Sequence, residues 1–343
     1  MTKTITSHPN PLPASGARGT FSAGADRGEG GNASVAISSK FALDPQHDAR
    51  HKLRRDALAR ESLVFMLQLP EHDVAAFVYT WVSGESKAGT AFCIYGPAIG
   101  KEPLFEAVDG IEVPFDMGFD DWRVGGCHVR QGKALEVVDV TFEGKAAQLE
   151  YHFEAMHPAY NYGAQIGGCP TWLADDRFEQ SGRVKGTLTI GGRKIPFDTF
   201  GHRDHSWGTR DWGAAQHWKW LESQAGEALA VHFFDIEAGG RNILRGYVQK
   251  DGRIEEVTSV RVNYTNDGNW NHTAIEAFVE DAGGRMTVVR GKTFALYEFK
   301  VSPLATLNEG SMSVEIDGVA GVGHVEMCWP KAYLDHLRQS GAK

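Results

Sequence analysis

Short runs of apolar or alternating residues, separated by tight-turn residues, recur from about residue 61 to the C-terminus and restrict the chain to mainly β structure. The clearest case is residues 183–190 and 193–200, which flank Gly191-Gly192. A two-residue Gly-Gly connection favours a β-hairpin, because the turns that match strand twist need positive φ. Residues 148–155 alternate polar and apolar, as a strand with one buried face does. Convincing helical periods are rare, so we predict antiparallel β architecture.

The predicted strands form two consecutive groups. They cover residues 62–70, 74–82, 89–95, 127–131, 134–142, 147–155, 183–190, 193–200, 227–236, 242–249, 253–264, 272–280, 285–292, 294–304, 310–316 and 319–328, with a short helix at 333–339. A segment with two prolines and three glycines, near residues 157–172, is the predicted joint. We therefore expect an all-β chain with one β domain at 46–168 and a second at 169–343, each a barrel or a sandwich.

Composition limits the class of protein and its partners. Residues 1–45 are rich in small and polar residues, so we predict a disordered N-terminal tail. The net charge of −9 argues against a nucleic-acid surface. The sequence contains neither an apolar run of spanning length nor an apolar segment after Lys3 that would form a secretory signal. The four cysteines form no C-x-x-C pair. These features predict a cytoplasmic protein without stable membrane insertion.

Residues 200–220 hold the densest set of reactive side chains. The stretch contains His202, Arg203, Asp204, His205, Trp207, Arg210, Asp211, Trp212, His217, Trp218 and Trp220. A solvated loop rarely carries four tryptophans, and a core strand rarely carries so many charges. The mixture predicts a half-buried site in which aromatic walls exclude water and a few ionisable groups have shifted proton affinities.

Asp204 is the first candidate for catalysis. A carboxyl group packed against indoles shifts toward its protonated form, and a protonated carboxyl can donate to an alkene or to a leaving hydroxyl. The alternative is a structural Asp204 that pairs with Arg203 or Arg210. If the segment is extended, His202, Asp204 and Ser206 share one face, while Arg203, His205 and Trp207 share the other. His205 and His202 are candidates for tuning or relaying the proton.

The candidate substrate-binding residues are mostly aromatic. If residues 217–220 form a strand, Trp218 and Trp220 lie on one face and His217 on the other, and either face could line a pocket. Further candidates are Trp207, Trp212, Tyr160, Tyr162 and His232. Each of them has a structural alternative. An indole equally well fills a core, and His232 in its apolar strand equally well is a hydrogen-bonded interior histidine.

Metal and nucleotide sites find little support in the sequence. The order His202-Arg203-Asp204-His205 echoes part of a metallohydrolase motif, but Phe200 stands where a further histidine is needed. No P-loop, nucleophile elbow or dinucleotide fingerprint is present, so we predict no cofactor and no metal. We expect Arg210 and Asp211 to form an ion pair that holds their loop.

The sequence from Gly201 to Trp212, Gly-His-Arg-Asp-His-Ser-Trp-Gly-Thr-Arg-Asp-Trp, follows the Gly-Gly hairpin and resembles a known family. It resembles the lipocalin-like two-domain proteins related to hydroxyneurosporene synthase (carotenoid 1,2-hydratase) and AttH, most closely their uncharacterised bacterial members. The resemblance is sharp over residues 178–220 and loose over 60–340. It implies paired lipocalin-like β-barrels that meet along a shared cleft, with Asp204 at the position of the family's acid.

The resemblance also implies a type of chemistry. Family members act without a cofactor on hydrophobic molecules, by hydrating an isoprenoid alkene or closing a ring. We therefore expect a lyase or isomerase of the hydratase, dehydratase or cyclase type, acting on a terpenoid, steroid-like or aromatic compound. Two alternatives stay open: a carrier that binds a hydrophobic ligand without chemistry, and a metal-dependent hydrolase. The expected partner is the small molecule itself, and a homodimer is an open alternative.

Overall fold

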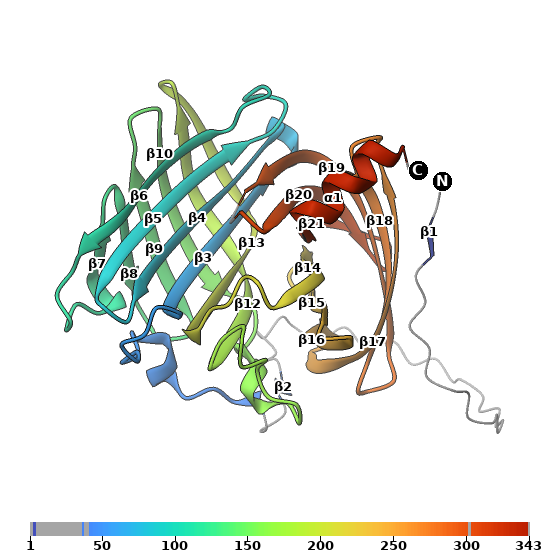
Figure 1. Cartoon of the computed structure of the whole chain (residues 1–343), viewed down its shortest axis with the longest axis horizontal. Coiled ribbons are helices and arrows are strands. Elements are labelled where there is room, and N and C mark those ends of the chain that lie inside the picture. Colours follow the sequence, from blue (N-terminus) through green and yellow to red (C-terminus); the bar gives the residue numbers. More distant parts are fainter. Residues whose placement is uncertain (1–2, 5–35, 38–40, 301–302, 342–343) are drawn as a thin grey trace, which may run out of the picture.

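A computed structural model describes residues 3–4, 36–37, 41–300 and 303–341 of the chain. Two β-barrels stand side by side, and each is built almost entirely of antiparallel strands (Figure 1). Within the described parts of the chain, no helix is long and apolar enough to cross a membrane. The predicted all-β class with two consecutive barrel domains is confirmed.

The first barrel is an 11-stranded sheet in the order β6-β5-β4-β3-β13-β12-β10-β9-β8-β7, with β11 paired to β12. Its strands are β3 (Ala59–Leu69), β4 (Val74–Ser83), β5 (Lys87–Tyr95), β6 (Leu104–Glu112), β7 (Trp122–Val124), β8 (Cys127–Gln131), β9 (Val137–Glu143), β10 (Ala147–Ala155), β11 (Tyr160–Asn161), β12 (Asp176–Ile190) and β13 (Arg193–Thr209). Short 3₁₀ helices lie at η2 (Pro45–Asp48), η3 (Pro70–His72), η4 (Phe119–Asp121) and η5 (Tyr162–Ala164).

The second barrel is a closed ring in which each strand pairs with the next and β21 pairs back with β14. Its strands are β14 (Ala215–Ala225), β15 (Leu229–Ala238), β16 (Arg241–Lys250), β17 (Arg253–Asn266), β18 (His272–Asp281), β19 (Met286–Phe299), β20 (Ala305–Ile316) and β21 (Val319–Pro330). The helix α1 (Lys331–Ser340) packs Leu334 and Leu337 into the core of this barrel. The two-residue strands β1 (Lys3–Thr4) and β2 (Ala36–Ile37) pair with β17.

Most of the predicted strands are present, but the predicted runs 285–292 and 294–304 form the single strand β19, and β7, β11 and β14 were not among the predicted ranges. The Gly191-Gly192 hairpin joins β12 to β13, and both glycines have positive φ, of 56° and 85°. The return strand does not stop at Phe200, however. It continues as β13 to Thr209, through most of the family-like sequence Gly201–Trp212, which we call the signature. Strand β6 was not predicted. Its side chains are mostly exposed, so it lacks the apolar pattern that marks the other strands.

Sheet membership divides the chain differently from the expected boundary between residues 168 and 169. Strands β12 and β13 belong to the first sheet, and the second barrel starts with β14. The signature strand therefore lies in the first barrel, not in the second as expected. The hairpin turn revealed the β12–β13 pairing, whereas the other partner of β13 is β3, which is distant in sequence and carries no local signal.

The expected disordered tail at 1–45 falls mostly outside the described residues. Of the part that is described, Phe41 is buried, with its ring centroid 5.3 Å from that of Tyr160. Just beyond, Asp48 of η2 is also buried. Ordered packing against the first barrel therefore begins before residue 46.

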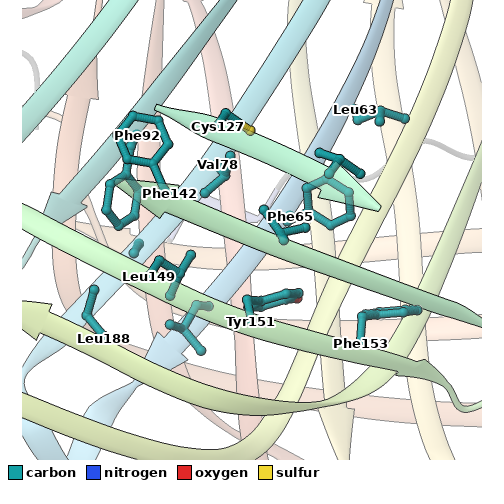
Figure 2. Close-up of a cluster of buried hydrophobic side chains, with 14 of the residues drawn as sticks. Leu63, Phe65, Val78, Phe92, Cys127, Phe142, Leu149, Tyr151, Phe153 and Leu188 are labelled. Carbon is teal, nitrogen blue, oxygen red and sulfur yellow. The ribbon is translucent and has the colours of Figure 1, made fainter. Parts of the chain in front are cut away.

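Alternation along the strands produces two barrel interiors and a third cluster between them. On β3, Leu63 and Phe65 belong to the core inside the first barrel (Figure 2). Their neighbour Met66 points the other way and packs with Trp218 and Trp220 of the second barrel. The outward faces of both barrels thus form one buried contact, and polar side chains there are removed from water.

A buried ion pair ties η2 to the inner face of β13. Arg203 Nη1 donates to Asp48 Oδ1 over 2.9 Å, and Arg203 Nε donates to Gln180 Oε1 over 2.9 Å. Asp48 Oδ2 also accepts from the backbone N–H of Leu135 over 2.6 Å. Because Arg203 is only 2 % exposed, water does not solvate its charge, and Asp48 compensates that charge instead.

We predict that Asp48→Ala lowers the free energy of unfolding by about 3–5 kcal/mol, because it leaves the Arg203 charge buried and uncompensated. Urea denaturation followed by circular dichroism measures the change. The matched control is Asp198→Ala, which breaks the exposed pair between Asp198 on β13 and Arg183 on β12. The control should leave the midpoint nearly unchanged. Equal shifts for the two variants would contradict the role of the buried pair.

Candidate functional site

A cavity of about 90 Å³ lies where the two barrels meet. A water molecule needs roughly 10–15 Å³ of such space, so the cavity has room for more than a single water. The first barrel and the following connection contribute Ser62, Val64, Met66, Phe77, Tyr79, Arg177, Asp204, Arg210 and Trp212. The second barrel contributes Trp218, Trp220, Phe234, Phe299, Leu307, Glu309 and Glu326. Most of the wall is aromatic or aliphatic, and its acids and arginines are few.

Asp204 reaches the cavity because β13 is extended through the signature. Alternation places His202 and Asp204 on the face toward the second barrel, while Arg203 and His205 point into the first. Asp204 Oδ2 accepts from Arg177 Nη2 over 2.7 Å. Its Oδ1 has no hydrogen-bond partner among the residues that the structure describes, and the side chain is buried. One carboxyl oxygen is therefore held by Arg177, while the other is buried and has no partner among the described residues.

The environment of Asp204 makes the carboxyl a weaker acid than an exposed aspartate. Burial raises the pKa of the carboxyl to about 6, Arg177 opposes the rise, and the charge of Glu179 adds to it. Burial penalises the charged form because water no longer solvates it. A carboxyl with a pKa near 6 exchanges protons readily at physiological pH, which suits a general acid or base.

Behind this wall, Glu179 accepts hydrogen bonds from three donors and lies close to the Tyr162 hydroxyl. Its Oε1 accepts from Arg177 Nε over 2.6 Å, from Trp220 Nε1 over 3.1 Å and lies 3.1 Å from the Tyr162 hydroxyl. Its Oε2 accepts from His202 Nε2 over 2.8 Å. Burial alone would raise the pKa of Glu179, but Arg177, His232 and His202 outweigh burial and lower it well below its usual range. Glu179 is therefore ionised and holds Arg177 in place.

His232 completes the network in its neutral form. Its Nδ1 donates to the Leu221 carbonyl over 2.9 Å, so its Nε2 accepts from the Tyr162 hydroxyl, 2.7 Å away. Burial lowers the pKa of His232 to about 3. The expected alternative for His232, a hydrogen-bonded interior histidine, matches this geometry. It lies behind the cavity wall and does not line it.

The structure brings seven of the eleven predicted site residues together. Four line the cavity: Asp204, Trp212, Trp218 and Trp220. Three form the network behind it: His202, Tyr162 and His232. As predicted, Trp218 and Trp220 lie on one face of β14, and this face lines the cavity.

The other four residues lie elsewhere. His205 faces the first barrel, where its Nε2 donates to Glu61 Oε1 over 2.7 Å. Trp207 lies on the same face and stacks on His51, with ring centroids 3.9 Å apart. His217 donates to the Cys328 carbonyl.

Tyr160 is buried, and its hydroxyl accepts from Gln165 Nε2 over 2.7 Å. For His205, Trp207 and His217, the cause is strand alternation, which puts odd-numbered residues of β13 and β14 on the face away from the cavity.

Sequence reasoning missed Arg177, Glu309 and Glu326. The available signal was a charged residue within an apolar strand, as with Glu326 between Val325 and Met327. The expected ion pair between Arg210 and Asp211 is wrong. Arg210 Nη2 instead donates to Ser206 Oγ over 2.7 Å, and its guanidinium lies 5.2 Å from the centre of the Trp212 ring.

Two groups of side chains have the composition of a metal site. They are His51 with Glu61 and His205, and Glu179 with His202 and His232. In the first group, Glu61 Oε1 accepts from both imidazoles over 2.7–2.8 Å. In the second, the Arg177 guanidinium already balances the Glu179 charge. Because the atoms that would bind a metal already make hydrogen bonds or ion pairs with one another, we assign neither group as a metal centre.

Solved structures share this arrangement of two barrels. An AttH candidate from Nitrosomonas europaea has a TM-score of 0.61 at 16% identity, with 83% of this chain and 96% of that chain covered. Kievitone hydratase from Nectria haematococca has a TM-score of 0.56 at 10% identity, covering 85% and 94%. CghA has a TM-score of 0.58 at 13% identity, covering 80% and 88%. At these identities the likeness establishes the fold.

Comparisons of the sequence identify one family. No curated protein matches the chain. One family model matches residues 44–331, which include both barrels and every residue that lines the cavity. The chain therefore belongs to the family described as Domain of unknown function (DUF7064).

Proposed function

We propose that the protein is a cofactor-independent lyase or isomerase of the hydratase, dehydratase or cyclase type, with Asp204 as proton donor to a hydrophobic small molecule. The observation that carries the proposal is the free Oδ1 of Asp204, buried in a mainly apolar cavity. A proton at this oxygen can be transferred to an alkene carbon or to a leaving hydroxyl. Either transfer leaves a cation, and the next step adds water, loses a proton or closes a ring.

The cavity wall supports such an intermediate. Trp212, Trp218 and Trp220 present indoles to the cavity, and an indole face attracts a cation. The aromatic and aliphatic wall also limits the access of water, which would otherwise capture the cation at random. A terpenoid, steroid-like or aromatic substrate fits this lining best, because it buries apolar surface against it.

The network behind the wall positions the acid. Arg177 touches Asp204 through one nitrogen and Glu179 through another, so Glu179 fixes the guanidinium that orients Asp204. His202 does not contact Asp204; it donates a hydrogen bond to Glu179, which in turn holds Arg177. His205 has no place in this mechanism, because it faces the interior of the first barrel.

The fold comparison is consistent with a hydratase-type reaction. Kievitone hydratase shares the two-barrel fold, and its name gives hydration as its reaction. CghA, another protein of this fold, has been solved with Sch210972. Because fold alone does not transfer a reaction, the proposal rests on the Asp204 geometry.

A carrier without chemistry is the competing function. It would call for an Asp204 locked in bidentate contact with an arginine. Asp204 is instead bound through one oxygen only, which favours the enzyme.

We predict that Asp204→Asn abolishes turnover, because the amide cannot donate an acidic proton. The assay incubates the protein in D₂O with a panel of terpenoid, steroid and aromatic alkenes and alcohols, including myrcene, linalool and kievitone. Mass spectrometry then detects water addition, water loss or deuterium on carbon. The free energy of unfolding should change by no more than about 1–2 kcal/mol, because Arg177 keeps Glu179 as a partner.

The matched control is Asp198→Asn, the same change at an exposed site on the same strand, which should leave turnover intact. Full activity of the Asp204 variant would refute the acid assignment. Binding of the panel by wild-type protein without any turnover would instead establish the carrier.

We also predict a pH dependence. Asp204 donates only in its protonated form, and its pKa is about 6. The value of kcat/KM for any panel substrate should therefore fall about tenfold per pH unit above pH 6, since kcat/KM reports ionisation in the free enzyme. Activity that rises between pH 6 and pH 8 would indicate that Asp204 acts as a base.

A further inference from the structure

The part of the cavity wall formed by the second barrel carries a second pair of acids. Glu309 on β20 and Glu326 on β21 are direct cross-strand partners, and both line the cavity. Residues opposite each other in an antiparallel pair have Cβ atoms about 4.5–5.5 Å apart, and like charges in this position repel. Glu309 is only 5 % exposed, so water screens this repulsion poorly.

Each carboxyl group also has a neighbour that orients it. Glu309 Oε2 lies 2.8 Å from His324 Nε2, and Glu326 Oε1 accepts from Trp218 Nε1 over 2.5 Å. The His324 ring is neutral at pH 7, because burial lowers its pKa to about 4. Neither His324 nor Trp218 therefore supplies a full positive charge that would keep the two acids ionised.

Burial and mutual repulsion favour protons on this pair. Burial raises the pKa of Glu309 to about 8. Burial, and then the charge of Glu309, raise the pKa of Glu326 to about 8, against smaller opposing effects of Trp218, His324 and Arg177. The other titratable groups that interact with the pair are Cys93, Tyr95, Tyr297 and Cys328, whose own pKa values are raised, so they are neutral at pH 7.

A second feature of the same cavity points to a ligand. Asp204 is nine-tenths buried and leaves its Oδ1 without a partner among the described residues. The rest of the cavity wall consists mainly of aromatic and aliphatic side chains, together with Arg177, Arg210 and Ser62. The cavity thus combines a few acids with a mainly apolar wall, which suits a molecule that is apolar except where it meets these acids.

We propose that the Glu309–Glu326 pair retains a proton and donates a hydrogen bond to an uncharged oxygen of the substrate. The substrate class is then an otherwise apolar molecule that carries a carbonyl or hydroxyl group. A carboxyl kept neutral in an apolar site is an effective donor to such an oxygen. An anionic group is disfavoured at this pair, because it would meet two acidic side chains there. This inference rests on the proposed function, which places the reacting atoms at Asp204.

The first test follows the pair through Trp218, whose indole N–H donates to Glu326. In protein labelled with ¹⁵N-tryptophan, the Trp218 indole signal, assigned with Trp218→Phe, should shift with a midpoint near pH 8. Glu326→Gln should abolish the shift. Glu309→Gln should lower its midpoint, because the like charge is gone. The control Glu222→Gln removes a buried acid that does not line the cavity and should leave the midpoint in place.

The second test measures binding of camphor and of bornane, its parent hydrocarbon, by the shifts of the same indole signal. At pH 6.5 camphor should bind about threefold to tenfold more tightly, the value of one neutral hydrogen bond. The preference should disappear above pH 9. In the Glu309→Gln/Glu326→Gln variant it should become independent of pH, because an amide still donates a hydrogen bond but does not titrate.

Both tests are repeated in the Asp204→Asn background, where the same results are expected. Turnover by the Asp204→Asn variant would refute the proposed function. The titration and binding tests do not depend on turnover, so they report on this inference separately. The inference is overturned if the Trp218 signal does not titrate between pH 6 and pH 9.5, or if Glu309→Gln leaves its midpoint unchanged. It is also overturned if camphor and bornane bind equally, or if neither binds up to its solubility.

Discussion

The alternation of side chains along β13 is the constraint on which the rest of the site depends. This strand belongs to the first barrel but lies against the second, so one face serves a core and the other serves the cavity. Arg203 and His205 therefore find partners inside the first barrel, in Asp48 and Glu61. Asp204, between them in sequence, points toward the second barrel. A register shift of one residue would exchange these faces and remove the acid from the cavity.

Burial between two barrels then determines the charge state of each acid. Glu179 accepts from the Arg177 guanidinium, from His202 and from Trp220, and it stays ionised. Asp204 shares that guanidinium through one oxygen only, and its pKa rises to about 6. Glu309 and Glu326 face each other and hold protons to higher pH. The acids in the cavity wall and the one behind it thus differ in pKa because their hydrogen-bond donors and neighbouring charges differ.

Local signals in the sequence were enough to predict most strands and part of the site. The Gly191-Gly192 turn revealed its hairpin, and the two-residue period predicted which signature residues share a face. The pairing of β13 with β3 has no local signal, so the boundary between the barrels was misplaced. Glu326 was missed because only the pairing of β21 with β14 brings it to the cavity, and Arg177 was missed because the predicted hairpin began at residue 183 and not at 176. His205 and Trp207 were chosen for residue type, although alternation had already placed them opposite Asp204.

The central claim is that Asp204 changes its protonation near neutral pH in the cavity between the barrels. A ¹³C NMR titration of the side-chain carboxyl carbons of aspartate, with the Asp204 signal assigned from Asp204→Asn, measures this property without a substrate. The account predicts a midpoint near pH 6. A midpoint at or below about pH 4, the ordinary value for an exposed aspartate, would contradict it.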